Sequence, residues 1–318
     1  MIAEPLNSAW ERVICPGCHG RVVSVGATVS CTSVVCGAEY PIIDAVPILI
    51  DERKSVFAIA DFQVGAATTF KPQNRFKKAV RRLLPSDGLN LASTRNYQSL
   101  SRLLKEVSAS PRVLVIGGGV IGEGSDSLLL DPAITVINTD VSRGLNVAMI
   151  CDAHDLPFDD KSFDGVVVQA VLEHVVDPVR CVSEIHRVLR PMGLVYSETP
   201  FMQQVHMGRY DFTRFTHLGH RRLFRNFEEV GSGVACGPGM ALAWAFECFL
   251  ISFATASWIR AGLRIVARLS SFYLKYFDYL LVDRPGAIDA ASGFWFIGRK
   301  ADNALSDRQL IGLYRGAL

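Results

Sequence analysis

The sequence predicts a doubly wound α/β fold with a seven-stranded sheet, preceded by a small cysteine-rich module. An apolar strand over residues 112–116 runs directly into a cluster of glycines. A second apolar strand over residues 134–140 ends at the acidic residue Asp140, about 20 residues after the glycines, which is a spacing typical of such sheets. Four cysteines within residues 13–50 predict the separate module at the N-terminus.

Length and composition limit the possible domain organisation and the possible partners of the chain. A chain of 318 residues can bury one full core and still carry a satellite module. The 33 basic and 31 acidic residues leave a net charge of +2, so the overall charge gives no argument for a nucleic-acid partner. The opening MIAEPLNSAW has no apolar run of the kind found in secretory signals, and we therefore expect a cytoplasmic protein.

The early cysteines form two pairs, each close to glycines that permit tight turns. Four thiolates on two such turns can surround one Zn²⁺ ion in a tetrahedron, and a segment of fewer than about 50 residues needs the metal for stability. The alternative is four free core cysteines, because the spacing of the second pair is the looser one. The predicted structural zinc ligands are Cys15, Cys18, Cys31 and Cys36.

From Cys36 the chain continues as CGAEYPIIDAVPIL. This segment resembles the small zinc-ribbon family that activates some tRNA and protein methyltransferases, and the resemblance covers about residues 13–51. The ribbon is a binding module in that family. The resemblance therefore implies docking to a protein partner, with no chemistry at the zinc.

The region between the ribbon and the α/β domain has helical periodicity and two clusters of turn residues. Basic and apolar residues interleave over residues 75–82, which predicts a basic amphipathic helix. Such a helix could lie on an anionic membrane surface. The alternative is a solvated helix face packed on the catalytic domain.

The glycine cluster follows the strand as PRVLVIGGGVIG, starting at Pro111. Glycine is needed where a Cβ would block a ligand or where φ must be positive, and the next helix offers free N–H groups. The cluster is weak evidence alone. It gains weight from Asp140, because an acid at that position can accept hydrogen bonds from both hydroxyls of a ribose.

Four further motifs follow in order. They read DAHDLPF at 152–158, SFDGV at 162–166, LEHVVDP at 172–178 and RVLRPMG at 187–193. The ordered set resembles class I S-adenosylmethionine (SAM)-dependent methyltransferases of the type 11 group, over about residues 111–200. A dehydrogenase shares the glycine loop but has no reason to carry the later motifs.

That resemblance implies a Rossmann-like sheet, SAM as cofactor and a role for each matching residue. Gly117 and Gly119 would line the methionine side, Asp140 would hold the ribose, Asp152 and Ala153 would contact the adenine edge, Gln169 would close the site, and His174 would neighbour it on the substrate side. The alternatives are a helix cap for Asp140 and a turn residue for Asp152. The sequence departs from the family at Val115, where an acid is usual, and this puts the cofactor affinity in question.

The predicted strand 194–198 is followed by a polar and aromatic loop at residues 206–217 that resembles the DFxRFT loop of methyltransferases in polysaccharide and glycolipid biosynthesis. Substrates of open α/β sheets bind beyond the carboxyl ends of the strands, so this loop should face the acceptor. We expect His206 or Asp211 to be the catalytic base, and Arg214 and Tyr210 to bind the substrate. The alternative is that Asp211 and Arg214 only pair with each other.

Residues 240–259 form an apolar run of membrane-spanning length with Glu247 near its middle, and GFWFIG at 293–298 resembles the closing strand of a methyltransferase sheet. We therefore expect a helical insertion over 240–292 that covers an apolar substrate or docks on the inner face of the membrane as a peripheral contact.

The sequence thus predicts four regions. They are a zinc ribbon at 1–55, a helical linker at 56–110, a SAM-dependent methyltransferase domain at 111–300 and a C-terminal tail at 301–318. The expected acceptor is a sugar-containing or lipid-linked small molecule. The alternatives are a non-catalytic binding or scaffold protein and a methyltransferase of RNA or of a translation factor. The last is disfavoured, because QAVL stands at 169–172 where such enzymes carry an NPPY-type tetrapeptide.

Overall fold

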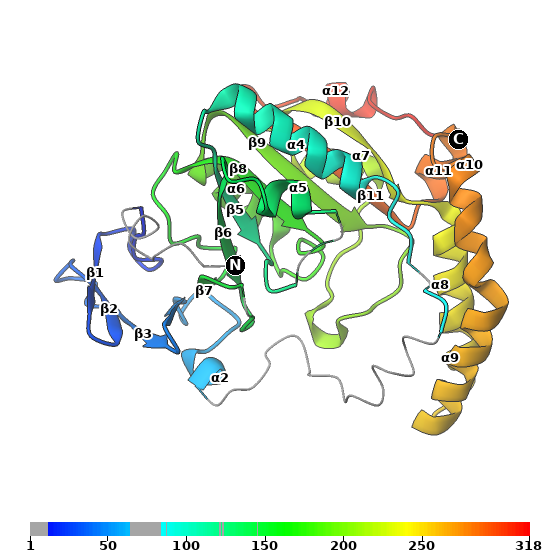
Figure 1. The fold of residues 1–318 in the computed structure, drawn as a ribbon, viewed down its shortest axis with the longest axis horizontal. Helices are drawn as coiled ribbons and strands as arrows, with labels where there is room; N and C mark the ends of the chain where they lie inside the picture. The colour runs from blue at the N-terminus through cyan, green and yellow to red at the C-terminus, as the bar shows by residue number, and fades with distance from the viewer. Residues whose placement is uncertain (1–11, 64–83, 87, 121, 123, 145) are drawn as a thin grey trace.

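The computed structural model describes residues 12–63, 84–86, 88–120, 122, 124–144 and 146–318. Its strands join into one eleven-stranded sheet with the order β1-β2-β3-β4-β7-β6-β5-β8-β9-β11-β10 (Figure 1). The predicted α/β fold is confirmed. The strands are β1 Val22–Val25, β2 Thr28–Cys31, β3 Glu39–Ile43, β4 Val46–Leu49, β5 Arg112–Ile116, β6 Thr135–Asp140, β7 Met149–Cys151, β8 Phe163–Gln169, β9 Leu189–Pro200, β10 Phe227–Cys236 and β11 Gly293–Lys300.

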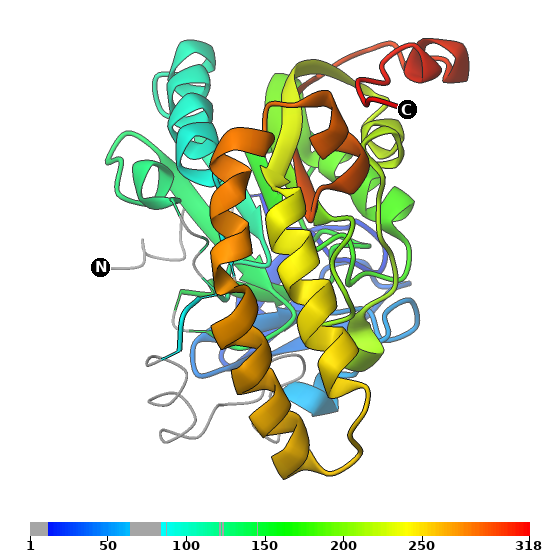
Figure 2. The same cartoon turned by 90° about the vertical axis from the view of Figure 1, so that its right-hand side faces the viewer.

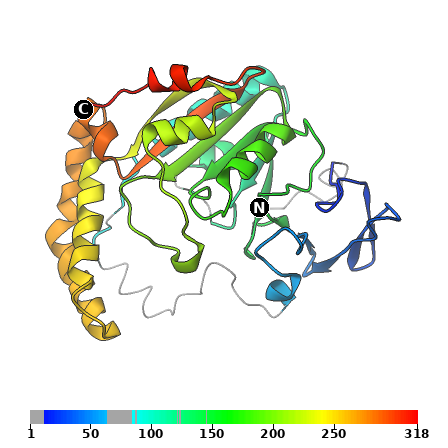
Figure 3. The ribbon, with the colours of Figure 1, turned by 180° about the vertical axis from the view of Figure 1, so that it is seen from behind.

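The centre of the sheet is parallel and carries helices on both faces. β5 pairs in parallel with β6 on one side and with β8 on the other, and both of its neighbours continue in parallel to β7 and β9. Helices α4 (Ser93–Val107) and α5 (Asp126–Leu129) cover one face, and α6 (Pro178–Val188) and α7 (His217–Leu223) cover the other (Figures 1 and 3). The carboxyl ends of the parallel strands therefore meet at one edge, where ligands of this architecture bind.

The N-terminal strands continue this sheet. β4 pairs in parallel with β7, so that Ile48 lies opposite Ile150 and Leu49 opposite Cys151. Val13 also forms an antiparallel bridge with Phe158. The expectation is a seven-stranded sheet with a separate ribbon. Seven of the eleven described strands, β5 to β11, do lie within residues 111–300, but the four ribbon strands join them in one sheet instead of standing apart. Pairing between strands about one hundred residues apart leaves no local pattern in a sequence, which is why it was missed.

The linker is described only in part. It contains helix α2 (Ile59–Gln63), and α4 ends it just before the α/β domain. The predicted basic amphipathic helix at residues 75–82 lies outside the described residues.

The predicted insertion before the last strand is a helical hairpin of α8 (Pro238–Ile251) and α9 (Ser257–Ser271), which lie side by side in Figure 2. Glu247 of α8 faces α9, where it forms ion pairs with Arg264 at 2.7 Å and Arg268 at 3.0 Å. Among the described residues, no helix combines the length and the apolar character that crossing a bilayer requires. The remaining elements are η2 Phe272–Phe277, α10 Asp278–Leu281, α11 Pro285–Ala290 and, after β11, α12 Asp307–Ile311.

Candidate active site

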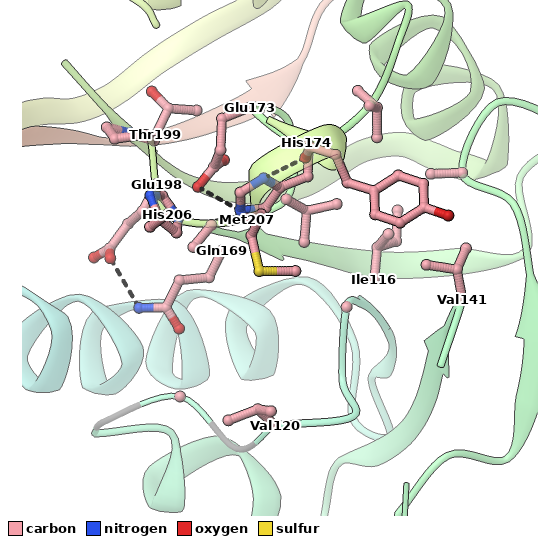
Figure 4. A pocket seen from close by; sticks show the side chains of 18 of the residues that line it. Ile116, Val120, Val141, Gln169, Glu173, His174, Glu198, Thr199, His206 and Met207 are labelled. Carbon is pink, nitrogen blue, oxygen red and sulfur yellow. Dashed lines mark hydrogen bonds and ion pairs between the residues drawn. The ribbon is translucent and has the colours of Figure 1, made fainter. Parts of the chain in front are cut away.

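A cavity of about 490 Å³ opens at the carboxyl ends of the parallel strands. It brings together residues that the sequence spreads over more than one hundred positions (Figure 4). Of the residues predicted for the cofactor and the substrate, those that line the cavity are Gly117, Asp140, Asp152, Ala153, Gln169, His174, His206 and Tyr210. Gly119, Asp211 and Arg214 are not among the lining residues.

The glycine turn after β5 is tight. The backbone N–H groups of Gly117 and Gly118 both donate to the carbonyl oxygen of Thr139, each at 2.9 Å. Gly117 has a φ of +79°, and a Cβ there would come within 2.4 Å of Val171 Cγ2. The turn therefore requires glycine for both its conformation and its packing.

Asp140 ends β6 and is held by backbone amides. The N–H of Gly119 donates to its Oδ2 at 2.8 Å, and the N–H of Ser142 donates to its Oδ1 at 2.8 Å. Burial raises the pKa of Asp140, although these amides oppose the shift. Gly119 thus holds the carboxylate of Asp140 without lining the cavity itself. A Cβ on Gly119 would lie 2.7 Å from Asp140 Oδ2.

Asp152, just after β7, is fixed from two sides. His154 donates its backbone N–H to Oδ1 at 3.0 Å, and its ring Nδ1 lies 2.5 Å from the same oxygen. The hydroxyl of Ser55 donates to Oδ2 at 2.5 Å. Burial opposes ionisation of Asp152, but the hydrogen bonds from His154 and Ser55 outweigh it and lower the pKa.

Ser55 introduces a segment that sequence reasoning missed. The chain that leaves the ribbon passes over the cavity, where Val56 and Phe57 form part of the wall. The ring of Phe57 stacks on Tyr210, with centroids 5.7 Å apart. No motif marks residues 55–57, so only the pairing of β4 with β7 could have indicated their position.

Gln169, at the end of β8, belongs to a buried network. Its amide Nε2 donates to Glu198 Oε2 at 2.8 Å, and its Oε1 accepts from the hydroxyl of Tyr97 at 2.9 Å. Asn90 also donates to Glu198 Oε2 at 2.9 Å. The side chain of Gln169 is therefore held in one orientation at the cavity wall.

Val115 lies away from this cavity. It packs against the cluster that contains Tyr97 and Val113, and it lines a separate space of about 20 Å³ together with Asn138. Its neighbour Ile116 lines the main cavity instead. The departure at Val115 therefore does not alter the lining of the main cavity around Asp140 and Asp152.

The other end of the cavity carries two histidines and an acid. His174 and His206 lie edge to face with ring centroids 4.9 Å apart, and His174 Nε2 lies 3.6 Å from Glu173 Oε1. Burial raises the pKa of Glu173 to about 8. Burial, together with the neighbouring His206, lowers the pKa of His174. Sequence reasoning missed Glu173, although it directly precedes His174 in the LEHVVDP motif.

Asp211 and Arg214 pair with each other, as the alternative interpretation has it. Arg214 Nη2 lies 3.0 Å from Asp211 Oδ2, and the other guanidinium nitrogens donate to backbone carbonyls that include those of Gln203 and Gln204. Burial alone would raise the pKa of Asp211, but Arg214 and the amide N–H groups of His206 and Met207 hold it well below its usual range. This pair fixes the loop that carries His206, and it makes Asp211 a weak base.

The four early cysteines converge as well. Their sulfurs lie within 4.8 Å of one another, with Cys15 Sγ 3.8 Å from Cys36 Sγ and Cys18 Sγ 3.5 Å from Cys31 Sγ. Zn–S bonds of about 2.3 Å in a tetrahedron separate the sulfurs by about 3.8 Å. All four are free thiols, so the cluster has the donors and the spacing of a Cys₄ zinc site.

Comparison with known proteins bears on the central part of the chain. Residues 116–197 match a family model described as a methyltransferase domain. An uncharacterized methyltransferase of Mycobacterium bovis is 37% identical over 103 residues, which cover 28% of this chain and 41% of the relative. A demethylmenaquinone methyltransferase of Renibacterium salmoninarum is 32% identical over 124 residues, which cover 36% of this chain and 52% of the relative. The chain thus spans about half or less of the length of these relatives.

Solved structures of methyltransferases are more distant. A phosphoethanolamine N-methyltransferase of Haemonchus contortus, in complex with phosphomonomethylethanolamine and S-adenosylhomocysteine, aligns with a TM-score of 0.40 and 18% identity over 68% of this chain and 55% of its own. The complex of the Trm112 methyltransferase activator with a methyltransferase from Haloferax volcanii aligns with a TM-score of 0.38 and 19% identity over 73% of this chain and 100% of its own. For residues 116–197, the family match and the named relatives support a SAM-dependent methyltransferase.

Proposed function

We propose that the protein is a SAM-dependent methyltransferase that acts on a small acceptor bound beside His174 and His206. One observation carries the proposal. The glycine turn, Asp140 and Asp152 line the same cavity as the two histidines, so a nucleoside and an acceptor can be held within reach of each other. A non-catalytic scaffold would have no need of this shared cavity.

The residues at the nucleoside end fit SAM. Asp140 and Asp152 are carboxylates fixed by backbone amides and by His154, which leaves each able to accept a hydrogen bond from a ligand. Gly117 lines the same cavity, and its φ of +79° lets the turn present its backbone closely to a ligand. When bound, SAM would supply an electrophilic methyl carbon on a sulfonium sulfur.

Methyl transfer needs little more than positioning. SAM held beside Asp140 and Asp152 would supply its methyl group to a lone pair of the acceptor and would leave as S-adenosylhomocysteine, so that the bond to carbon gained by the acceptor is the one lost by sulfur. A hydroxyl acceptor also loses its proton. We assign that proton to His206, because His206 lines the cavity whereas Asp211 is paired with Arg214.

The acceptor end suits a molecule with both apolar and polar parts. Its wall combines apolar residues such as Val175, Val176 and Phe294 with the polar groups of Glu173 and Thr199. This mixture supports a sugar-containing or lipid-linked acceptor. Some relatives are named demethylmenaquinone methyltransferases, and an acceptor of that kind also has an apolar and a polar part.

Calorimetric titration with SAM tests the cofactor assignment. We expect binding by the native chain, and a Kd raised about 10- to 100-fold in Asp140→Ala, which loses a charged hydrogen-bond acceptor. Asp126→Ala is the matched control, because Asp126 is an exposed acid outside the cavity. Absence of binding at concentrations on the order of 1 mM would rule out the enzymatic proposal.

We further propose that the cysteine cluster holds one structural Zn²⁺ and that its ribbon offers a docking surface to a protein partner. Cys15 is buried in the same core cluster as Leu49 and Phe158, so the ion would stabilise the sheet as well as the ribbon. Elemental analysis of protein purified under reducing conditions should find one zinc per chain, and none in Cys31→Ser. Protein that contains no metal and still melts like the native chain would contradict the zinc site.

The helical hairpin is our candidate for peripheral contact with the cytoplasmic face of a membrane. Near the turn between α8 and α9, Phe253 is 74% exposed and Trp258 is 76% exposed, with Arg260 close by. Flotation with vesicles that contain anionic lipid should show binding that Trp258→Ser weakens. Ile311→Ser is the control, because Ile311 is 72% exposed on α12 instead of on the hairpin. Equal flotation of all three proteins would exclude the hairpin as the contact.

A further inference from the structure

The acceptor end of the cavity has the donor set of a metal site. We propose that Glu173, His174 and His206 bind a divalent transition-metal ion, at a site separate from the cysteine cluster. One ligand atom from each of the three side chains lies within 4.8 Å of the others. Figure 4 shows the three side chains close together, with the contact between Glu173 and His174 drawn as a dashed line.

The tautomer of His174 is set by its surroundings. Its Nδ1 lies 2.8 Å from the backbone carbonyl oxygen of Tyr210. A carbonyl can only accept, so Nδ1 carries the hydrogen and Nε2 presents a lone pair. That lone pair faces Glu173 Oε1 at 3.6 Å, which is also an acceptor when ionised. A metal ion bound between these two groups would keep Glu173 ionised and would bridge the two acceptors.

His206 is oriented in the same way. Its Nδ1 lies 3.2 Å from the carbonyl oxygen of Gln204 and 3.5 Å from Asp211 Oδ2, which leaves Nε2 as the free lone pair. A ring nitrogen fixed by a carbonyl or carboxylate, with the other nitrogen free, is the usual arrangement of metal-binding histidines. The ion pair between Asp211 and Arg214 therefore gains a role, because it fixes the group that orients His206.

Glu173 supplies the observation that a purely structural role leaves unexplained. It is 1% exposed, and its Oε2 has no hydrogen-bond partner among the described residues. A buried carboxylate oxygen without a partner is costly, and a metal ion would satisfy it. Metal–ligand bonds of about 2.0–2.2 Å separate neighbouring donors by about 3–3.5 Å, so the distance of 3.6 Å between Glu173 and His174 requires only a small closure.

Two imidazoles and one carboxylate select the class of ion. Nitrogen donors favour zinc, iron or cobalt over magnesium and calcium, which prefer oxygen. Three protein ligands leave open positions that face the cavity. An acceptor oxygen could fill one of them and would become more acidic there. This part of the inference rests on the proposed function; with His206 acting as a ligand in place of a base, the proton of a metal-bound hydroxyl would pass to water.

The metal site can be tested without methyl transfer. Protein with zinc retained in the cysteine cluster is titrated with Co²⁺ by calorimetry, and elemental analysis verifies that the zinc stays. We expect one Co²⁺ per chain. We also expect a Kd at least tenfold higher in Glu173→Gln and in His206→Gln. His186→Gln is the control, because His186 is half-buried outside the cavity.

A second measurement covers the case in which a variant fails to fold. Paramagnetic Co²⁺ should broaden or shift the imidazole signals of His174 and His206 in the native chain and leave those of His186 in place. Absence of Co²⁺ binding, or binding that moves neither His174 nor His206, would overturn the metal site. Because SAM binding is titrated separately, failure of the metal site alone would leave the proposed function standing.

Discussion

The two ends of the cavity are built from different kinds of structural element. At the proposed nucleoside end, backbone amides at the ends of neighbouring parallel strands hold Asp140, while His154 and Ser55 hold Asp152. At the proposed acceptor end, His174 and His206 pack edge to face from separate loops, and a carboxylate oxygen of Glu173 lies within 4.8 Å of a ring nitrogen of each. The groups at the first end of the cavity directly follow strands of the sheet, whereas those at the second end lie on loops that extend from the sheet.

This difference separates what must stay constant from what can vary. A backbone cradle at a strand end cannot change without moving the sheet, so it suits a cofactor common to many reactions. Loops can change length and side chains without altering the core, so they suit the acceptor. Substitutions at the first end should therefore lower the affinity for SAM, whereas substitutions at the second end should lower kcat.

The largest effect is expected at the glycine turn. Gly117→Val would place atoms within 2.4 Å of Val171 Cγ2 and force a side chain to adopt a φ of +79°. We expect the Kd for SAM, measured by calorimetry, to rise more than about 100-fold. Gly286→Val is the control, because nothing lies within 4 Å of a Cβ there. Similar SAM affinity in both variants would contradict the expected difference between the two ends of the cavity.

Asp211→Asn should act on the acceptor end alone. It removes the charge that pairs with Arg214 and orients His206. Loss of a buried charged hydrogen bond is worth about 1.5–3 kcal/mol, so we expect kcat to fall about 10- to 100-fold. The Kd for SAM should stay within about twofold. A parallel loss of SAM binding would mean that the loop supports both ends.

The packing behind β9 can be tested through pH. His220 is buried behind β9, its Nε2 lies 2.9 Å from Ser197 Oγ, and burial lowers its pKa to about 3. The unfolded chain binds a proton below about 6.5 that the folded chain refuses. Stability should therefore be lost as the pH falls from about 6.5 towards 3, by up to ~1.4 kcal/mol per unit.

Chemical denaturation across this pH range measures the effect. His220→Gln should give a shallower pH dependence than the native chain, because glutamine does not titrate. Identical slopes would show that His220 is not the residue responsible.

The smallest effect is expected where the ribbon segment meets the cofactor end. Ser55→Ala removes one hydrogen bond to Asp152, worth about 1 kcal/mol, so the Kd for SAM should rise about fivefold. Ser24→Ala on the exposed face of β1 is the control. If SAM binds both variants equally, the segment at 55–57 only covers the cavity and does not orient Asp152.

The residues of the proposed cofactor end could be placed from the sequence because they follow directly from strands. The glycine run and Asp140 each end an apolar segment, and parallel strands end at the same edge. The convergence of Asp140 and Asp152 on one cavity follows from that rule alone. Gly119 was placed in the right turn, but only the coordinates distinguish a residue that lines the cavity from one that holds Asp140.

The acceptor end was predicted less completely, because its geometry depends on packing between distant segments. His174 and His206 were each named, but their contact with each other depends on how the loop at residues 203–214 packs against Glu173, just after β8. Glu173 was missed, because a glutamate next to a histidine in a motif gives no sign of whether it is buried. The contribution of residues 55–57 depends on β4 joining β7, and no local pattern records that pairing.

The pairing of β4 with β7 has a consequence for how this protein would lose its native state. Without β4, the apolar strand β7 would present unpaired backbone N–H and C=O groups at an open sheet edge. An ion in the cysteine cluster would then indirectly protect the chain from strand-to-strand self-association. Metal depletion should therefore show itself first as aggregation, before any change in chemistry can be measured.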